Sequence, residues 1–145
     1  MWLPQPSACK ILVIRLGGFS RNLRQEVTNK SKYYFLDNGI RNAVIAQFNG
    51  FDPRNDAGAL WENFMFVERL KYRTYHPLYA NTYFWRIYCG QKIDLVEEYA
   101  SVLHGCEFKW SQVKPVTAPK AWLAAYPESN FTVIHPGNYQ EFLLG

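Results

Sequence analysis

Two carboxylates and a lysine in the second half of the sequence have a spacing that could support metal chemistry. Asp94 lies in the apolar run KIDLV, and Glu107 is followed two residues later by Lys109. Side chains alternate between the two faces of a strand, so Glu107 and Lys109 share one face while Cys106 and Phe108 point to the other. The second pair is apolar and is expected in the core, which leaves the acid and the amine side by side.

The two carboxylates are expected to face each other across neighbouring strands. If the strands carrying Asp94 and Glu107 pair, two like charges come together, and a cation or a proton must lie between them. Hard divalent cations favour such an all-oxygen setting, so the sequence predicts a Mg²⁺ site, which Mn²⁺ could also occupy. Glu62, from a preceding helix, is the expected third ligand.

Ordinary ion pairs would explain the same residues without a metal. The alternatives are an ion pair between Glu107 and Lys109, one between Asp94 and Lys92, and a Glu62 bonded to backbone amides or to Arg86.

The elements that would position these groups follow from hydrophobic patterns. Strands are expected at 10–16, 32–36, 82–88, 92–98, 102–110 and 131–134, and helices at 20–27, 40–48, 59–72, 120–126 and 139–144. Asp37-Asn38-Gly39 predicts a turn after the second strand. The links between the three middle strands are short, so they should form an antiparallel meander.

The helix at 59–72 is apolar on most sides and is therefore expected to be buried. A charged Glu62 inside such a helix is costly unless it is paired or bound to a cation. This cost is the reason for placing Glu62 at the candidate site.

The spacing Asp94-x12-Glu107-x-Lys109 after a helical Glu62 resembles the PD-(D/E)xK nuclease superfamily. The surrounding sequence is more specific and is similar to the C-terminal, nuclease-like region of a family of prokaryotic AAA-type ATPases, a domain of unassigned function. This resemblance covers roughly residues 12 to 143 and is carried by SRNLRQEVTNKSKYYFLDNGIRNAVI, LWENFMFVERL, FWRIYCGQKIDLVEE, EFKW and PKAWLAAYPESNFTVI.

The resemblance implies an α/β, restriction-endonuclease-like core in which a helix, a three-strand meander, a helix and a strand follow one another. It divides the chain into an unmatched segment 1–10, a winged-helix remnant or β-wing at 11–37 and a nuclease-like domain at 38–145. This sequence contains no GxxxxGK[ST] phosphate loop, so the ATPase module of the family is not part of it. An ATPase module in trans is one candidate partner.

The activity that the resemblance implies is Mg²⁺-dependent hydrolysis of phosphodiester bonds in DNA. Asp94, Glu107 and Glu62 would hold the metal, and Lys109 would orient a water molecule. The alternative is a non-catalytic module that binds nucleic acid or protein and regulates or targets an ATPase. One departure favours this alternative: Lys92 stands where the family usually has an acidic residue, and by strand parity it shares a face with Asp94.

Positive charge is concentrated at the start of the chain. The net charge is +4, and residues 1–41 carry seven basic against two acidic side chains. Such a field attracts phosphate backbones, although a solvated surface would look the same. The residues expected to contact nucleic acid are Arg21, Arg24, Lys30, Lys32 and Arg86.

Composition excludes several other classes of protein. With 48% apolar and 19% charged residues, the chain is expected to fold around a core rather than remain disordered. No apolar run approaches the roughly 20 residues of a membrane helix, and no secretion signal is recognisable. Three cysteines without CxxC spacing predict neither a disulfide framework nor a zinc site. We therefore expect a cytoplasmic protein that does not enter membranes.

Overall fold

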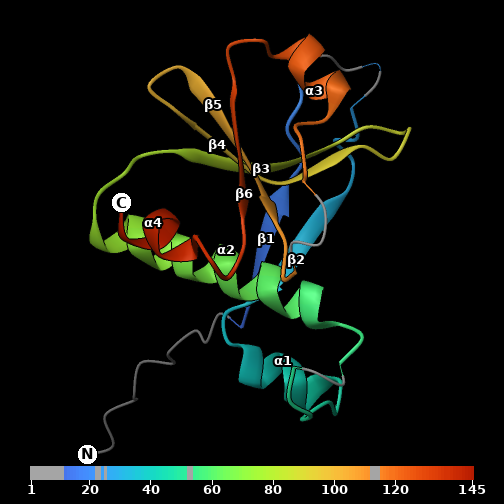
Figure 1. Cartoon of the computed structure of the whole chain (residues 1–145), viewed down its shortest axis with the longest axis vertical. Coiled ribbons are helices and arrows are strands. Elements are labelled where there is room, and N and C mark those ends of the chain that lie inside the picture. Colours follow the sequence, from blue (N-terminus) through green and yellow to red (C-terminus); the bar gives the residue numbers. More distant parts are fainter. Residues whose placement is uncertain (1–11, 22–23, 25, 52–53, 112–114) are drawn as a thin grey trace, which may run out of the picture.

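The computed structural model describes residues 12–21, 24, 26–51, 54–111 and 115–145. Segment 1–10 and Leu23, in the helix expected at 20–27, lie outside the described residues. The described part is a mixed α/β structure with two sheets and four helices, which confirms the α/β part of the prediction (Figure 1). Its elements, in chain order, are β1 (Val13–Gly17), β2 (Ser31–Phe35), α1 (Asn38–Val44), α2 (Ala57–Tyr75), β3 (Asn81–Arg86), β4 (Lys92–Tyr99), β5 (Val102–Phe108), α3 (Lys120–Ala125), β6 (Asn130–Ile134) and α4 (Tyr139–Leu144).

The main sheet has four strands in the order β3-β4-β5-β6. β3, β4 and β5 form the predicted antiparallel meander, with Val96 opposite both Tyr83 and Gly105. β6 pairs with β5 in parallel, because α3 carries the chain back along the sheet before β6 begins. The predicted order of helix, three strands, helix and strand is therefore confirmed.

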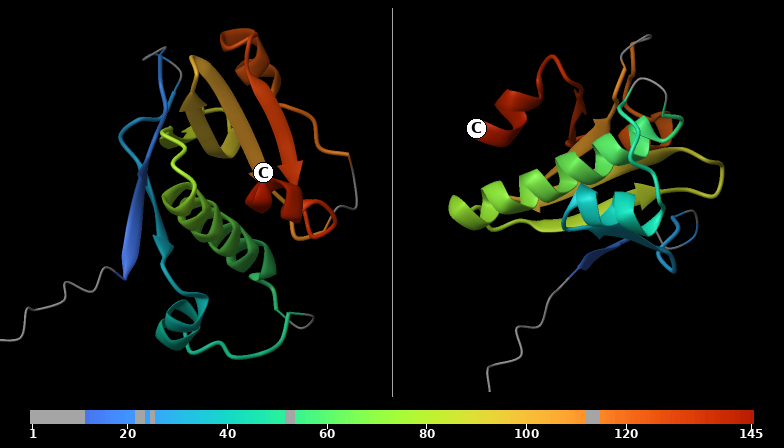
Figure 2. Two further views of the ribbon diagram at one scale, coloured as in Figure 1. Left: turned by 90° about the vertical axis from the view of Figure 1, so that its left-hand side faces the viewer. Right: turned by 90° about the horizontal axis from the view of Figure 1, so that it is seen from below.

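Helices cover both faces of this sheet. α2 and α4 lie together on one face, where α2 brings Met65 and Phe66 against Leu95 and Phe108 (Figures 1 and 2). α3 closes the other face through Trp122, which packs on Trp85 with ring centroids 5.3 Å apart. Both faces are thus apolar, and the residues at their centre are almost completely buried.

The β1–β2 hairpin is attached to β3, the edge strand of the main sheet. Phe19 N–H donates to the Phe84 carbonyl at 2.7 Å, and Val27 N–H donates to the Arg86 carbonyl at 2.9 Å. Gly18 makes this approach possible, because a Cβ there would lie 2.5 Å from the Val27 carbonyl oxygen. The hairpin therefore shares its core with the segment expected to be the nuclease-like domain.

Several elements begin or end a few residues away from their predicted bounds, and three short segments differ in kind or length. No described residue between 20 and 27 is helical: Ser20 Oγ donates to buried Glu26 at 2.6 Å, and this segment runs along β3 instead. Asp37 is the N-cap of α1 rather than part of a free turn, since its Oδ1 accepts from Gly39 N–H at 2.6 Å. α1 ends at Val44, not at residue 48, because none of its residues is buried and no packing extends it.

Candidate functional site

A β-bulge in β4 sets the position of Asp94. Tyr83 pairs with Val96, and Trp85 pairs with Ile93. Two residues of β4, Asp94 and Leu95, therefore stand opposite one residue of β3, Phe84. An extra residue of this kind bends a strand and redirects its side chains. Asp94 consequently lies at the start of β4 with its carboxylate buried at 1% exposure.

Glu107 and Lys109 come from the end of β5, as the alternation of side chains predicts. The pairing of Leu95 with Cys106, continued by one residue, puts Asp94 opposite Glu107. The backbone N–H of Phe108 donates to Asp94 Oδ2 at 3.1 Å, and Lys109 Nζ donates to Glu107 Oε1 at 2.7 Å. The predicted juxtaposition of the two strand carboxylates is thus present.

Glu62 approaches from α2, and a lysine of β2 joins it to the strands. Lys32 Nζ lies 2.7 Å from Glu62 Oε1 and 3.0 Å from Asp94 Oδ1. The Tyr34 hydroxyl, also from β2, donates to Glu62 Oε1 at 2.8 Å. Glu62 is less buried than its helix suggests, with 21% of its side chain exposed, because the hairpin rather than the sheet covers it.

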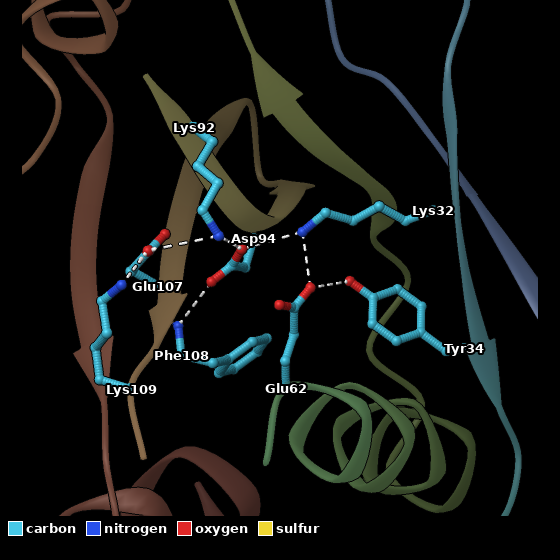
Figure 3. Close-up of polar contacts among 8 residues, drawn as sticks. All are labelled: Lys32, Tyr34, Glu62, Lys92, Asp94, Glu107, Phe108 and Lys109. Carbon is cyan, nitrogen blue, oxygen red and sulfur yellow. Dashed lines mark hydrogen bonds and ion pairs between the residues drawn. The ribbon is translucent and has the colours of Figure 1, made fainter. Parts of the chain in front are cut away.

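Lys92 completes a continuous row of alternating charges. Its Nζ lies 2.8 Å from Asp94 Oδ1 and 3.9 Å from Glu107 Oε1. Figure 3 shows the resulting order of contacts, in which each carboxylate bonds at least one ammonium group. We call this set the charge row, and its members are Glu62, Lys32, Asp94, Lys92, Glu107 and Lys109.

The ammonium groups control ionisation in the charge row. Burial alone would raise the pKa of Asp94, but Lys32 and Lys92 outweigh it and hold that pKa below its ordinary value. For Lys92, burial opposes the charged form, yet attraction from Asp94 is stronger and raises its pKa. Asp94 and Lys92 are therefore both charged near neutral pH.

Glu107 behaves in the opposite way. Burial and the nearby Asp94 carboxylate together raise the pKa of Glu107, against the bond from Lys109. Burial and Glu62 likewise raise the pKa of Tyr34, which keeps its phenol protonated as a donor. The strand carboxylates thus differ: Asp94 is held ionised, and Glu107 takes up a proton more readily.

The charge row contains the residue types of a Mg²⁺ site but not its charge balance. Three carboxylates face three ammonium groups, and among the described residues no group of three or more His, Cys, Asp or Glu is arranged to hold a metal ion. One atom is an exception to this pairing: Glu107 Oε2 is buried and accepts no hydrogen bond from any described residue. In this arrangement the donors do not fit a metal, because ammonium groups occupy the space around Asp94.

The residues expected to bind nucleic acid have separate surroundings. Arg21 forms an ion pair with Glu98 at 2.5 Å, and Lys32 belongs to the charge row. Arg24 and Lys30 lie exposed between β1 and β2, and Arg86 is exposed on β3, opposite Lys92. The structure therefore brings Glu62, Asp94, Glu107 and Lys109 together, whereas the basic residues do not form one cluster.

Sequence reasoning missed the central part played by Lys32. It assigned this lysine to a phosphate backbone, because the sequence shows a basic segment but not that the hairpin folds onto α2. The alternation of side chains along the SKYYF strand is a signal that could have identified Lys32, because it places Lys32 on the same face as Tyr34, which is 4% exposed. A lysine next to a buried tyrosine on the inward face requires a carboxylate partner.

Comparison with family models assigns the larger part of the chain. Residues 57–143 match the domain of unknown function DUF4143. The chain belongs to this family. The DUF4143 match begins with α2 and ends within α4, so it includes every member of the charge row except Lys32.

The other comparisons add no relative to this DUF4143 protein. Neither the curated proteins nor the solved structures gave a match. No helix in the described residues has the length and apolar character needed to cross a bilayer. The function of the family is unknown.

Proposed function

We propose that this chain is a nuclease-like module that binds nucleic acid without cleaving it and that targets or regulates an ATPase acting in trans. The observation that carries the proposal is the double bonding of Asp94 Oδ1 by Lys32 and Lys92, at 3.0 and 2.8 Å. These ammonium groups stand where a restriction-endonuclease-like centre would need a cation. They satisfy the acid that the fold buries, and so the site needs no metal.

Charge balance supports this reading. Binding of Mg²⁺ at Asp94 would require displacement of ammonium groups that already neutralise it, because cations at the same carboxylate repel each other. The lysine at position 92 matters most, since an acidic residue there would add a ligand where Lys92 adds a competing charge. Under this proposal, Glu62, Asp94, Glu107 and Lys109 are the residues of a nuclease-like centre whose negative charge Lys32 and Lys92 neutralise.

Basic side chains outside the charge row would bind the nucleic acid. Arg24, Lys30 and Arg86 are exposed, and they form no ion pair with another described residue. Contacts of this kind would follow the phosphate backbone of DNA without reading its sequence. Affinity should accordingly fall steeply as salt is raised.

A second function, Mg²⁺- or Mn²⁺-dependent phosphodiester hydrolysis, is favoured by a single atom. Glu107 Oε2 is a buried acceptor without a donor, and burying such an atom unpaired is costly. Lys109 lies beside it and would be available to orient a water molecule. This candidate requires Lys32 and Lys92 to leave Asp94, which the ion pairs oppose.

The two functions separate in one set of measurements. Fluorescence anisotropy with a labelled DNA duplex reports binding, and supercoiled plasmid with Mg²⁺ or Mn²⁺ reports cleavage. We expect salt-sensitive binding, no nicking, and no rise of the unfolding midpoint on adding either ion. Nicking by the wild type that is lost in Lys109→Ala would refute the non-catalytic proposal.

The variant Lys92→Glu tests the charge argument directly. It replaces the competing ammonium group with a carboxylate, and we expect Mg²⁺ or Mn²⁺ to raise the unfolding midpoint of this variant but not of the wild type. Lys120→Glu is the matched control, because Lys120 is an exposed lysine at the start of α3, away from the charge row. An equal response of both variants to the ions would show that the effect is only general charge.

A further inference from the structure

An apolar groove lies between α1, the first turns of α2 and Trp110, the second residue after β5. Its volume is about 440 Å³, and its walls are Leu60, Trp61, Phe64, Phe51 and Trp110, with two asparagines of α1 at one side. Phe51 stacks on Trp110 at a centroid distance of 4.6 Å, which makes one wall flat and aromatic. A volume of this size would hold several apolar side chains.

The surface beside the groove is also unusually apolar. α1 contributes no buried residue, and the side chains of Val44 and Phe48 are 67% and 74% exposed. Phe64 and Phe51 are 38% and 42% exposed at the mouth. Large apolar side chains exposed at the groove and on the neighbouring helix suit the packing of another chain segment or partner.

Leu12, the first described residue of the chain, bonds the strand end that leads into this groove. The Leu12 carbonyl accepts from Leu36 N–H at 3.0 Å. Leu36 is two residues before Asn38, which lines the groove. The Cα atoms of Leu36 and Asn38 are therefore at most about 7 Å apart, so Leu12 lies close to this side of the groove. The eleven residues that precede Leu12 span up to about 40 Å when extended, several times the distance required.

The composition of that segment suits an apolar groove. It reads MWLPQPSACKI, with a tryptophan and a leucine at positions 2 and 3 and only one charged side chain, Lys10. The prolines at positions 4 and 6 reduce the number of conformations that the free segment can adopt. Attachment to Leu12 also gives the segment a local concentration in the millimolar range, so a weak intrinsic affinity is enough.

We propose that the N-terminal segment docks in cis, with Trp2 and Leu3 occupying the groove between α1 and α2. The segment then acts as an intramolecular cover for the apolar end of the helical layer. Aromatic contacts with Trp61 and Trp110 provide the recognition, and the short connection from Leu12 provides the selectivity for the chain's own segment over a second copy.

Paramagnetic relaxation in the full chain tests this directly. A nitroxide is attached to Cys9 in a Cys89→Ser background, where Cys106 stays unlabelled because it is buried. We expect the indole N–H resonances of Trp61 and Trp110 to broaden. Those of Trp85 and Trp122 should stay sharp, because they pack on the other face of the sheet and serve as internal controls.

Variants distinguish docking from mere attachment of the segment. Trp2→Ser with Leu3→Ser, and separately Phe64→Glu, should abolish the broadening. Leu123→Glu, an equivalent change at a 46% exposed leucine of α3, should leave it intact. Each variant is first checked for a cooperative unfolding transition, which shows that it is folded, and a second groove variant, Phe51→Ser, replaces Phe64→Glu if that protein does not fold.

Three outcomes would overturn the proposal. Broadening that persists in the Trp2→Ser, Leu3→Ser variant would come from attachment alone. Sharp Trp61 and Trp110 signals in the labelled wild type would show an empty groove. Broadening in an unlabelled, ¹⁵N-enriched chain mixed with labelled chain would show that a second copy covers the groove instead.

Discussion

Replacing Lys32 with methionine removes one ammonium group from the charge row and keeps its aliphatic stem. In the wild type this group bonds Glu62 on α2 and Asp94 on β4. Lys32→Met leaves Asp94, which is 1% exposed, with Lys92 and the Phe108 N–H as its remaining donors. The variant should therefore be less stable than the wild type.

The size of the loss follows from burial. Removing one partner of a fully buried ion pair costs about 3–5 kcal/mol. Here the Lys32 side chain is 26% exposed and Asp94 keeps a second lysine, so a smaller loss of about 2 kcal/mol is expected. For a chain of this length, such a loss lowers the unfolding midpoint by about 4–8 °C.

The dependence on pH has a defined sign. The pKa of Asp94 is lowered in the folded state, so its ionised form stabilises the fold above the ordinary carboxyl pKa, and this contribution disappears as the pH falls through the folded value. Lys32→Met reduces the lowering. The stability gap between variant and wild type should thus be largest near neutral pH and should shrink below about pH 4.

Urea denaturation at several pH values measures this gap, with Lys30→Met as the control because Lys30 is an exposed lysine one residue before β2. A gap below about 0.5 kcal/mol at neutral pH would refute the reasoning, since that is the range of ordinary surface substitutions. A gap of the same size at all pH values would assign the loss to packing of the stem rather than to charge.

Three further predictions concern the rest of the fold. Ala100 and Ser101 form the two-residue β4–β5 turn with φ of 50° and 62°, so Ser101→Gly should stabilise the protein by about 1 kcal/mol in thermal unfolding. Tyr126→Phe removes a hydrogen bond to buried Glu26 and should lower the free energy of unfolding by about 1–3 kcal/mol. Burial and Glu26 raise the pKa of Tyr126 to about 12, and ultraviolet titration of the wild type should show this. Burial raises the pKa of the Cys106 thiol to about 12, so iodoacetamide near pH 8 should leave it unmodified until the protein unfolds, as peptide mapping would reveal.

Each of these has a matched control. Ser111→Gly places glycine at an exposed serine without positive φ and should not stabilise. Tyr79→Phe alters a tyrosine that is 91% exposed and should be nearly neutral. Cys89 is an exposed thiol that iodoacetamide should modify in the folded protein. Stabilisation by Ser111→Gly, an equal cost for both tyrosines, or early modification of Cys106 would contradict the corresponding prediction.

The sequence was most informative where a local pattern has one geometric consequence. The period of two in EFKW placed Glu107 and Lys109 on one face, and the short links predicted the meander that brings Asp94 to them. The bulge at Asp94 and Leu95 was not predictable, because nothing in KIDLV marks the extra residue. At this bulge Asp94 bonds Lys32, and that lysine joins it to Glu62.

Long-range contacts account for the rest of what the sequence did not reveal. The stretch 20–27 has a helical pattern in isolation, but backbone bonding to β3 and the burial of Glu26 outweigh this weak local preference. Lys32 looked like one basic residue among several, and only the fold of the hairpin onto α2 separates it from them. The winged-helix and restriction-endonuclease-like interpretations remain predictions.

The placement of Lys32 on a surface hairpin, with both partners in the body of the fold, links events at the two places thermodynamically. Anything that draws this lysine outward leaves Asp94 with less positive charge nearby, and its affinity for protons rises. By reciprocity, protonation of Asp94 weakens its bond to Lys32, and this favours binding of any ligand that draws Lys32 away from Asp94. Attachment of a polyanion to the hairpin would then be accompanied by net proton uptake in mildly acidic solution.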